Sequence, residues 1–327
     1  MITSDPRAGQ AAPTLFEIEA ARRRIDGLAR PTPLERSAFL SEHCGHDVYL
    51  KLECWQQTRS FKVRGAANAV ALLSSSHRAR GVVAASAGNH GQAVALAARH
   101  AGIRATVFVP ADAPATKKER IRRLGATLDD GAASYDDAEI AAREYAAHSG
   151  GVLIHAFSDA AVVAGQGTVG LEILEDLADL EDVLVPVGGG GLVAGIGIVL
   201  KERSRAIGVI GVQSVETRAM HDALLAGRVV DTAITPTLAD GLAGSTDDLA
   251  FQRARRVLDG MLLVEESEIA DAMRLLFIHE GIVAEGSGAV GVAALLRGHF
   301  EPRGPTVVVV TGGNVDAARF AALLART

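Results

Sequence analysis

The stretch VLVPVGGGGLVAGIGIVLKER, residues 183–203, contains an apolar run, four consecutive glycines and a helical stretch rich in small and aliphatic residues. The apolar run does not alternate with polar residues, which is typical of a strand that is buried on both faces of a sheet. A buried strand, a glycine turn and a helix in this order predict one strand–helix unit of a parallel sheet.

The same succession recurs along the chain. Apolar runs at residues 81–86, 105–110 and 306–310 precede helical stretches at 91–102, 116–126 and 315–325, and a further apolar run occupies 206–214. Strands that alternate with helices predict an α/β fold, in which open and largely parallel sheets are flanked by helices.

The length of 327 residues is typical of two domains. An acidic, alanine-rich patch at residues 129–147 precedes the apolar segment GVLIHAFSD at 151–159, and both belong to a smaller strand–helix group that begins near Gly81. The sequence therefore predicts a small domain of residues 81–157 inserted into a large domain of residues 1–80 and 158–327.

Composition excludes several classes of protein. The chain is 48% hydrophobic and 22% charged, with a formal net charge of −6, which indicates a compact globular protein and not a disordered one. Aromatic residues are only 4%, and the one basic cluster, KKERIRR at 117–123, has the spacing of a solvated helix face, so nucleic acid is not an expected partner.

Compartment is predicted from the cysteines and from the N-terminal residues. Cys44 and Cys54 have neither metal-ligand spacing nor a partner framework for disulfides, which indicates a reducing environment. The N-terminal segment lacks an apolar signal core, and no run of about 18 apolar residues exists for a membrane span. We therefore expect a cytoplasmic protein that does not bind a membrane.

Three glycine-containing loops follow predicted strands: SAGNHG at 86–91, GGGGL at 188–192 and TGGN at 311–314. In open α/β sheets, ligands bind at the carboxyl ends of strands, where such loops lie. Four glycines in a row allow successive backbone N–H groups to turn toward one point at a helix N-terminus, which favours phosphate binding. Tight packing of strand on helix would explain one or two of these glycines, but hardly four.

A dinucleotide is the main rival ligand for this loop. Gly189, Gly191 and Ala194 match the G-x-G-x-x-G/A pattern, but that pattern requires an acidic residue at the end of the next strand. Here the next strand ends in Gln213 and Ser214. A nucleotide-binding protein without catalytic chemistry therefore stays open as an alternative that rests on the glycine loop alone.

Two other segments carry polar groups to helix starts. SAGNHG offers Ser86, Asn89 and His90 on one turn, more than helix capping needs, and its helix N-terminus suits a carboxylate. SFKVRGA, residues 60–66, places Lys62 where the helix dipole disfavours a cation. A phosphate loop, a carboxylate loop and a lysine beside an aromatic residue are together the components of a pyridoxal phosphate site, where such a lysine forms a Schiff base with the cofactor aldehyde.

The sequence resembles the serine/threonine dehydratase (ammonia-lyase) family of pyridoxal phosphate enzymes, which have the tryptophan-synthase-β-like fold (fold type II). The matching segments run through nearly the whole chain. They include PTPLERS at 31–37, SFKVRGA at 60–66, SAGNHGQAVA at 86–95, PVGGGGLVAG at 186–195, LADGLA at 238–243, EGSGAVGVAAL at 285–295 and TGGNVD at 311–316.

The resemblance implies a role for each candidate site residue. Lys62 carries the cofactor and moves the Cα proton, Phe61 lies against the cofactor ring, and Thr311 bonds its nitrogen. Asn89 bonds the ring hydroxyl and, with Ser86 and His90, surrounds the substrate carboxylate. The phosphate is assigned to Gly188, Gly189, Gly190 and Gly191. The large predicted domain would bind the cofactor, and the small one the substrate.

The implied reaction is β-elimination of water from an L-hydroxy amino acid of the threonine or serine type, a degradative step that gives a 2-keto acid and ammonia. The resemblance also implies a homodimer. One alternative is a dehydratase for a hydroxylated compatible-solute derivative, as in hydroxyectoine catabolism, because EGSGA and CWQQTRS differ from the commoner family wording. Another is an amino-acid racemase of the same fold. The resemblance implies that such racemases carry a Ser at the position where this chain has Ala87.

No metal ion is expected beside the cofactor. Family members that bind a divalent cation there carry acidic ligands just after the strand that corresponds to residues 206–212. This chain has Gln213 at the first such position and Ala219 at the second, and Glu216 offers one carboxylate where a hard cation needs about six oxygen ligands.

Overall fold

The computed structural model describes residues 11–325, which form two compact units. Of the described residues, unit 1 contains 11–30 and Lys62–Thr168, and unit 2 contains Pro31–Phe61 and 169–325. The first ten residues of the segment that we expect to lack a signal core lie outside the described residues. Among the helices of residues 11–325, none is long and apolar enough to cross a membrane.

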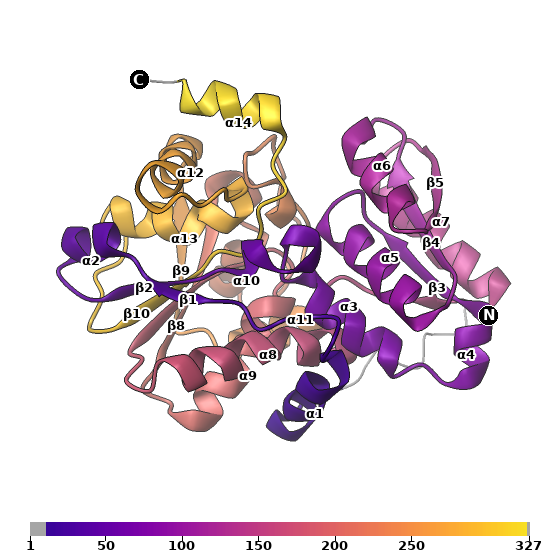
Figure 1. Cartoon of the computed structure of the whole chain (residues 1–327), viewed down its shortest axis with the longest axis horizontal. Coiled ribbons are helices and arrows are strands. Elements are labelled where there is room, and N and C mark those ends of the chain that lie inside the picture. The colour runs from indigo at the N-terminus through magenta and orange to yellow at the C-terminus, as the bar shows by residue number, and fades with distance from the viewer. Residues whose placement is uncertain (1–10, 326–327) are drawn as a thin grey trace. The chain divides into compact units, whose positions relative to one another are not determined.

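Unit 1 is built on a parallel four-stranded sheet in the order β5-β4-β3-β6. Its strands are β3 (Val82–Ala85), β4 (Ala105–Pro110), β5 (Thr127–Ala132) and β6 (Val152–Leu153). Its helices are α1 (Leu15–Ile25), α3 (Lys62–Ala71), α4 (Ser75–Arg80), α5 (Asn89–Ala101), α6 (Ala115–Arg123), α7 (Tyr135–Ser149) and the first half of α8 (Ala160–Asp176). Figure 1 shows these elements in indigo to magenta, apart from α8.

Side chains of β3 alternate between two apolar layers. Val82 and Ala84 pack with α1, α3 and α5, whereas Val83 and Ala85 pack with α7. This alternation is expected of a strand that is covered on both faces. Helix α3 therefore shares the hydrophobic core of the small sheet.

The four strands of unit 1 all lie within residues 81–157, which were predicted to be the small domain. The compact unit around them is larger, because α1, α3, α4 and the start of α8 group with this sheet. One cause is a close helix contact: a Cβ on Gly65 of α3 would lie 2.8 Å from the Val162 carbonyl oxygen of α8. The assignment of the two predicted domains to substrate and cofactor remains a prediction.

Unit 2 has a six-stranded sheet in the order β1-β2-β10-β7-β8-β9, parallel except for the antiparallel edge pair β1–β2. Its strands are β1 (Leu34–Arg36), β2 (Val48–Lys51), β7 (Asp182–Pro186), β8 (Gly208–Ser214), β9 (Gly260–Val264) and β10 (Thr306–Val309). Its complete helices are α2 (Ala38–Cys44), α9 (Gly191–Arg203), α10 (Ala219–Ala226), α11 (Asp248–Arg255), α12 (Glu266–Glu280), α13 (Gly286–Leu296) and α14 (Ala317–Leu324).

Helices cover both faces of this sheet. Leu184 of β7 packs into a core formed with α2, α12, α13 and α14, whereas its neighbours Val183 and Val185 pack with α8 and α9. In Figure 1, α12 and α13 lie on one side of these strands, and α8 and α9 on the other. Two largely parallel sheets, each flanked by helices, confirm the predicted α/β fold class.

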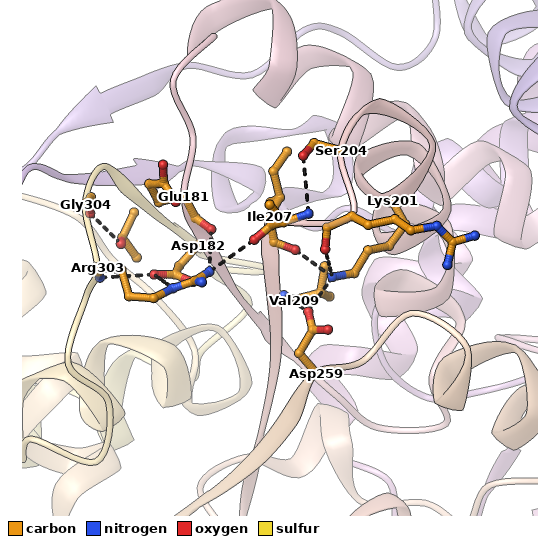
Figure 2. A network of polar contacts seen from close by, with 12 residues as sticks. Glu181, Asp182, Lys201, Ser204, Ile207, Val209, Asp259, Arg303 and Gly304 are labelled. Carbon is orange, nitrogen blue, oxygen red and sulfur yellow. Dashed lines mark hydrogen bonds and ion pairs between the residues drawn. The ribbon is translucent and has the colours of Figure 1, made fainter.

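A polar network closes the amino ends of the unit 2 strands (Figure 2). Arg303 contacts the buried Asp182 carboxylate at 2.6 Å and donates to the Ala206 carbonyl at 3.3 Å. Lys201 pairs with Asp259 at 2.5 Å, and Asp259 also accepts from the Val209 N–H. The glycine loops lie at the opposite, carboxyl ends of β7 and β10, so this network supports the sheet away from the candidate site.

Candidate active site

Lys62 is the first residue of α3, as the sequence predicts. Its Nζ atom donates a hydrogen bond to the Ala156 carbonyl oxygen at 3.0 Å. Burial lowers the pKa of Lys62 to about 8, because the charged form is penalised in a poorly hydrated environment. A substantial fraction of this amine is therefore neutral near pH 7 to 8, as a nucleophile or proton acceptor requires.

His90 is buried in the first turn of α5, close to the segment that Lys62 contacts. Its Nε2 lies 2.8 Å from the Ile154 carbonyl oxygen, which can only accept, so Nε2 must carry the proton. Burial is the main cause that lowers the pKa of His90 to about 3, with a smaller contribution from the charge of Lys62. The imidazole is therefore neutral, and its Nδ1, which has no partner among the described residues, is an acceptor.

This tautomer bears on the predicted role of His90 beside a substrate carboxylate. A neutral ring whose buried nitrogen accepts cannot donate to a carboxylate oxygen. The backbone N–H groups at the start of α5 can, since the helix begins at Asn89 behind Gly88, which supplies no side-chain cap. Ser86 shapes this turn, because its Oγ accepts from the Gly88 N–H at 3.1 Å.

The glycine loop of unit 2 joins β7 to α9. Gly190 has φ +97°, and a Cβ there would lie 2.8 Å from Met220 Cε. Gly190 is also the N-cap residue of α9, so no side chain caps the first amide groups of this helix. The buried Thr246 contacts this loop, since its hydroxyl donates to the Gly189 carbonyl at 3.3 Å. An uncapped 13-residue helix behind a glycine loop fits an anionic oxygen group.

The third loop follows β10 and pairs with the residues before Lys62. Ser60 forms an antiparallel bridge with Gly312, and the Phe61 N–H donates to the Thr311 carbonyl at 3.1 Å. The Thr311 side chain is buried, and its hydroxyl makes a long hydrogen bond of 3.4 Å to the Ser287 carbonyl. Phe61 is half-buried against the core of α9.

Sequence reasoning missed several residues that support these groups. The carbonyls of Ile154 and Ala156 orient His90 and Lys62, yet a backbone acceptor has no sequence signature. Thr246 lies 57 residues from the glycine whose carbonyl it contacts. The left-handed backbone of Thr58 and Arg59 also had no signal, because neither residue type favours it.

Gln213, which stands where the first acidic ligand of a metal would be expected, has hydrogen bonds within its own segment. Gln213 Nε2 donates to the Thr217 carbonyl at 2.7 Å, and Gln213 Oε1 accepts from the His221 N–H at 2.9 Å. Residues 11–325 contain no group of three or more His, Cys, Asp and Glu side chains able to hold a metal ion. The expected absence of a metal remains a prediction.

Comparison with known proteins identifies the family. A family model described as pyridoxal-phosphate dependent enzyme matches residues 25–312. An L-threonine ammonia-lyase of Thermotoga maritima is 46% identical over 93% of this chain and 76% of its own length. Among solved structures, maize serine racemase has a TM-score of 0.92 and 32% identity, covering 96% of this chain and 97% of its own. The threonine deaminase of T.th. has a TM-score of 0.87 and 38% identity, covering 93% and 99%.

The chain therefore belongs to the pyridoxal-phosphate-dependent enzyme family. The relatives also confirm the narrower prediction, which is a pyridoxal-phosphate-dependent ammonia-lyase of the serine/threonine dehydratase type with fold type II architecture.

The residues present fit this cofactor. Within unit 1, an amine with a lowered pKa is available for covalent attachment. Within unit 2, the glycine loop leaves the first amide groups of α9 without a side-chain cap, so these N–H groups can donate to a phosphate. Thr311 supplies a buried hydroxyl that can donate to an unprotonated ring nitrogen.

Proposed function

We propose that this protein eliminates water from L-threonine or L-serine and releases a 2-keto acid and ammonia. The observation that carries the proposal is the position of Lys62 at the start of α3, where its Nζ donates to the Ala156 carbonyl at 3.0 Å and burial lowers its pKa to about 8, which suits a catalytic base near neutral pH. The name of the Thermotoga maritima relative, L-threonine ammonia-lyase, supports threonine as a substrate.

Pyridoxal phosphate, when bound, supplies an electron-withdrawing group that acidifies the α-proton of the substrate. Lys62 would hold the cofactor and then take that proton on Nζ, and the Ala156 carbonyl would steady the resulting ammonium group. Gly188, Gly189, Gly190 and Gly191 would bind the phosphate through backbone N–H groups. Thr311 would donate to the ring nitrogen and Phe61 would lie against the ring.

The substrate carboxylate would bind at the start of α5, through the N–H groups near Asn89 and His90 and the hydroxyl of Ser86. Asn89 would also bond the ring hydroxyl. Loss of the α-proton and of the β-hydroxyl as water leaves an enamine, which hydrolyses to the keto acid and ammonia. For L-threonine, the products are 2-oxobutanoate and ammonium.

Lys62→Ala tests the central assignment. We expect the variant to stay folded, because Lys62 begins a helix and is not part of the apolar core, but to lose covalent cofactor and activity. Borohydride reduction of the parental holoenzyme followed by peptide mapping should place the cofactor on Lys62. A label on another lysine would refute the assignment, and no ammonia from L-threonine or L-serine would refute the reaction.

A serine racemase activity is the second candidate, favoured by the likeness to maize serine racemase. We consider it weaker because Ala87 provides no hydroxyl for a second proton donor. A cytoplasmic location, a homodimer and activity without a divalent cation complete the proposal. The two predicted domains would divide cofactor and substrate binding, with residues 81–157 serving the substrate.

A further inference from the structure

Two residues shortly before Lys62 have a strained backbone. Thr58 has φ +58° and Arg59 has φ +55°, and within residues 11–325 they are the only non-glycine residues with positive φ. L-amino acids disfavour this left-handed region, and β-branched threonine disfavours it most. Such a conformation persists only where surrounding contacts hold it, and it is found most often at functional sites.

The bend gains little from the Thr58 side chain itself. The Oγ1 atom of Thr58 is buried and has no hydrogen-bond partner among the described residues. Its main-chain carbonyl, in contrast, accepts from Asn314 Nδ2 at 2.7 Å. The carbonyl of Arg59 accepts from the Gly313 N–H at 3.0 Å, so the loop that follows β10 holds the bend.

Asn314 is in turn fixed by a buried carboxylate. Its backbone N–H donates to Glu285 Oε2 at 3.0 Å, and the Glu285 N–H donates to the Gly312 carbonyl at 3.0 Å. A continuous chain of hydrogen bonds therefore runs from Glu285 through Asn314 to Thr58. All of these residues belong to unit 2.

We infer that Asn314 is a positioning residue, which holds the strained bend at Thr58 and thereby fixes Phe61 and Thr311 for contact with the cofactor. Phe61 lies two residues beyond Arg59, its N–H donates to the Thr311 carbonyl at 3.1 Å, and Lys62 follows Phe61 in the chain. The inference rests on the cofactor contacts given in the proposed function.

Asn314→Ala removes the donor that holds the Thr58 carbonyl. Thr58 is then free to relax to negative φ, which disturbs the register of Phe61 against Thr311. In the holoenzyme we expect cofactor affinity to fall about 10-fold or more. The visible absorption band of the bound cofactor should also shift, and kcat for L-threonine should fall more than KM rises.

Thr58→Gly provides the rescue. Glycine adopts positive φ without a steric penalty, so the bend no longer depends on Asn314. The double variant Thr58→Gly/Asn314→Ala should recover cofactor affinity to within about 3-fold of the parental enzyme. Thr58→Ala is the matched control, because it removes the hydroxyl and the branch but keeps the Cβ that penalises positive φ. It should rescue little.

The measurements are cofactor titration by absorbance and the spectrum of each purified holoenzyme. Parental affinity and spectrum in Asn314→Ala would overturn the inference, as would equal rescue by Thr58→Gly and Thr58→Ala. If Asn314→Ala is insoluble, Asn314→Asp replaces it, because it keeps the side-chain shape and removes the Nδ2 donor. It is then combined with Thr58→Gly and Thr58→Ala in the same way. Failure of the proposed reaction is a separate outcome, in which the parental enzyme releases no ammonia. The cofactor affinities of the variants would still test the role of Asn314.

Discussion

At the scale of the single residue, Lys62 illustrates how placement changes chemistry. An exposed lysine has a pKa of about 10.4 and is almost fully protonated at neutral pH. Burial at the start of α3 lowers the pKa of Lys62 to about 8, while the Ala156 carbonyl still offers its amine a hydrogen-bond acceptor. The residue can therefore act as a nucleophile and as a base in the same pH range.

The rate at which apo-protein takes up pyridoxal phosphate should report this pKa. Only the neutral amine attacks an aldehyde, so the rate should rise about tenfold per pH unit below the pKa and level off above about pH 8. Stopped-flow absorbance would measure it, with Nα-acetyl-lysine as the unburied reference. A rate that keeps rising to pH 10, as for the reference, would show that the amine is not perturbed.

Ala87 should decide between elimination and racemisation. Racemisation needs a proton donor on each face of the reacting carbon, and a methyl group supplies none. The neighbouring Ser86 has a hydroxyl, but the proposed function assigns that hydroxyl to the substrate carboxylate, and its Oγ is fixed by the Gly88 N–H. We therefore expect keto acid from L-serine with negligible D-serine, and some D-serine from Ala87→Ser but not from Ala87→Gly. Chiral chromatography of the remaining substrate gives the answer, and D-serine formed by the parental enzyme as fast as keto acid would contradict it.

At the scale of the element, each glycine loop converts a helix N-terminus into a binding group. Helix α9 begins behind Gly190, and α5 begins behind Gly88, and neither residue contributes a side-chain cap. No cap side chain therefore competes with an oxygen ligand for the first amide groups of these helices. A capping serine or aspartate would stabilise the helix but occupy those amides.

Gly190→Ala tests whether this loop binds the cofactor phosphate, as distinct from the general cost of backbone strain. At φ +97°, an alanine Cβ would also meet Met220 at 2.8 Å, so we expect stability to fall by about 1–3 kcal/mol and cofactor affinity to fall at least about tenfold. Gly227→Ala is the control, since it has φ +69° with no atom within 4 Å of the new Cβ. It should lose stability but keep cofactor affinity. Equal affinities in the two variants would argue against phosphate binding at this loop.

At the scale of the whole molecule, the larger sheet separates stability from chemistry. Its strands carry the Gly188–Gly191 loop and Thr311 at their carboxyl ends, whereas Arg303, Asp182, Lys201 and Asp259 join their amino ends (Figure 2). Substitutions in this network should therefore affect folding without touching the site.

Arg303→Ala tests this separation. Asp182 is 1% exposed, so loss of its partner leaves a buried carboxylate with little compensation, and we expect unfolding free energy to fall by about 2–3 kcal/mol. Arg297→Ala removes an exposed pair with Asp271 and should cost less than about 1 kcal/mol. Denaturant unfolding measures both, and kcat per folded molecule should stay at the parental value. A large loss of kcat in Arg303→Ala would refute the separation.

Apolar periodicity and turn residues were enough to predict the α/β class and most of the element order. Strand β4 spans the predicted residues 105–110, and α9 begins one residue before its predicted start at 192. These features are encoded locally, because apolar runs, helical spacing and glycine turns depend on neighbouring residues. The same local signals identified the glycine loops and Lys62 as candidates.

The contacts that support those candidates join segments far apart in the chain, so they could not be predicted. Ala156 lies 94 residues from Lys62, and Asn314 lies 256 residues from Thr58. The bend at Thr58 opposes the preference of its own residue type, so no local pattern could reveal it. The grouping of α3 with the small sheet likewise depends on long-range packing, since its apolar residues share one core with α5 and β3. Local sequence sets which elements form, but contacts between distant segments set the tautomer of His90, the pKa of Lys62 and the strained bend.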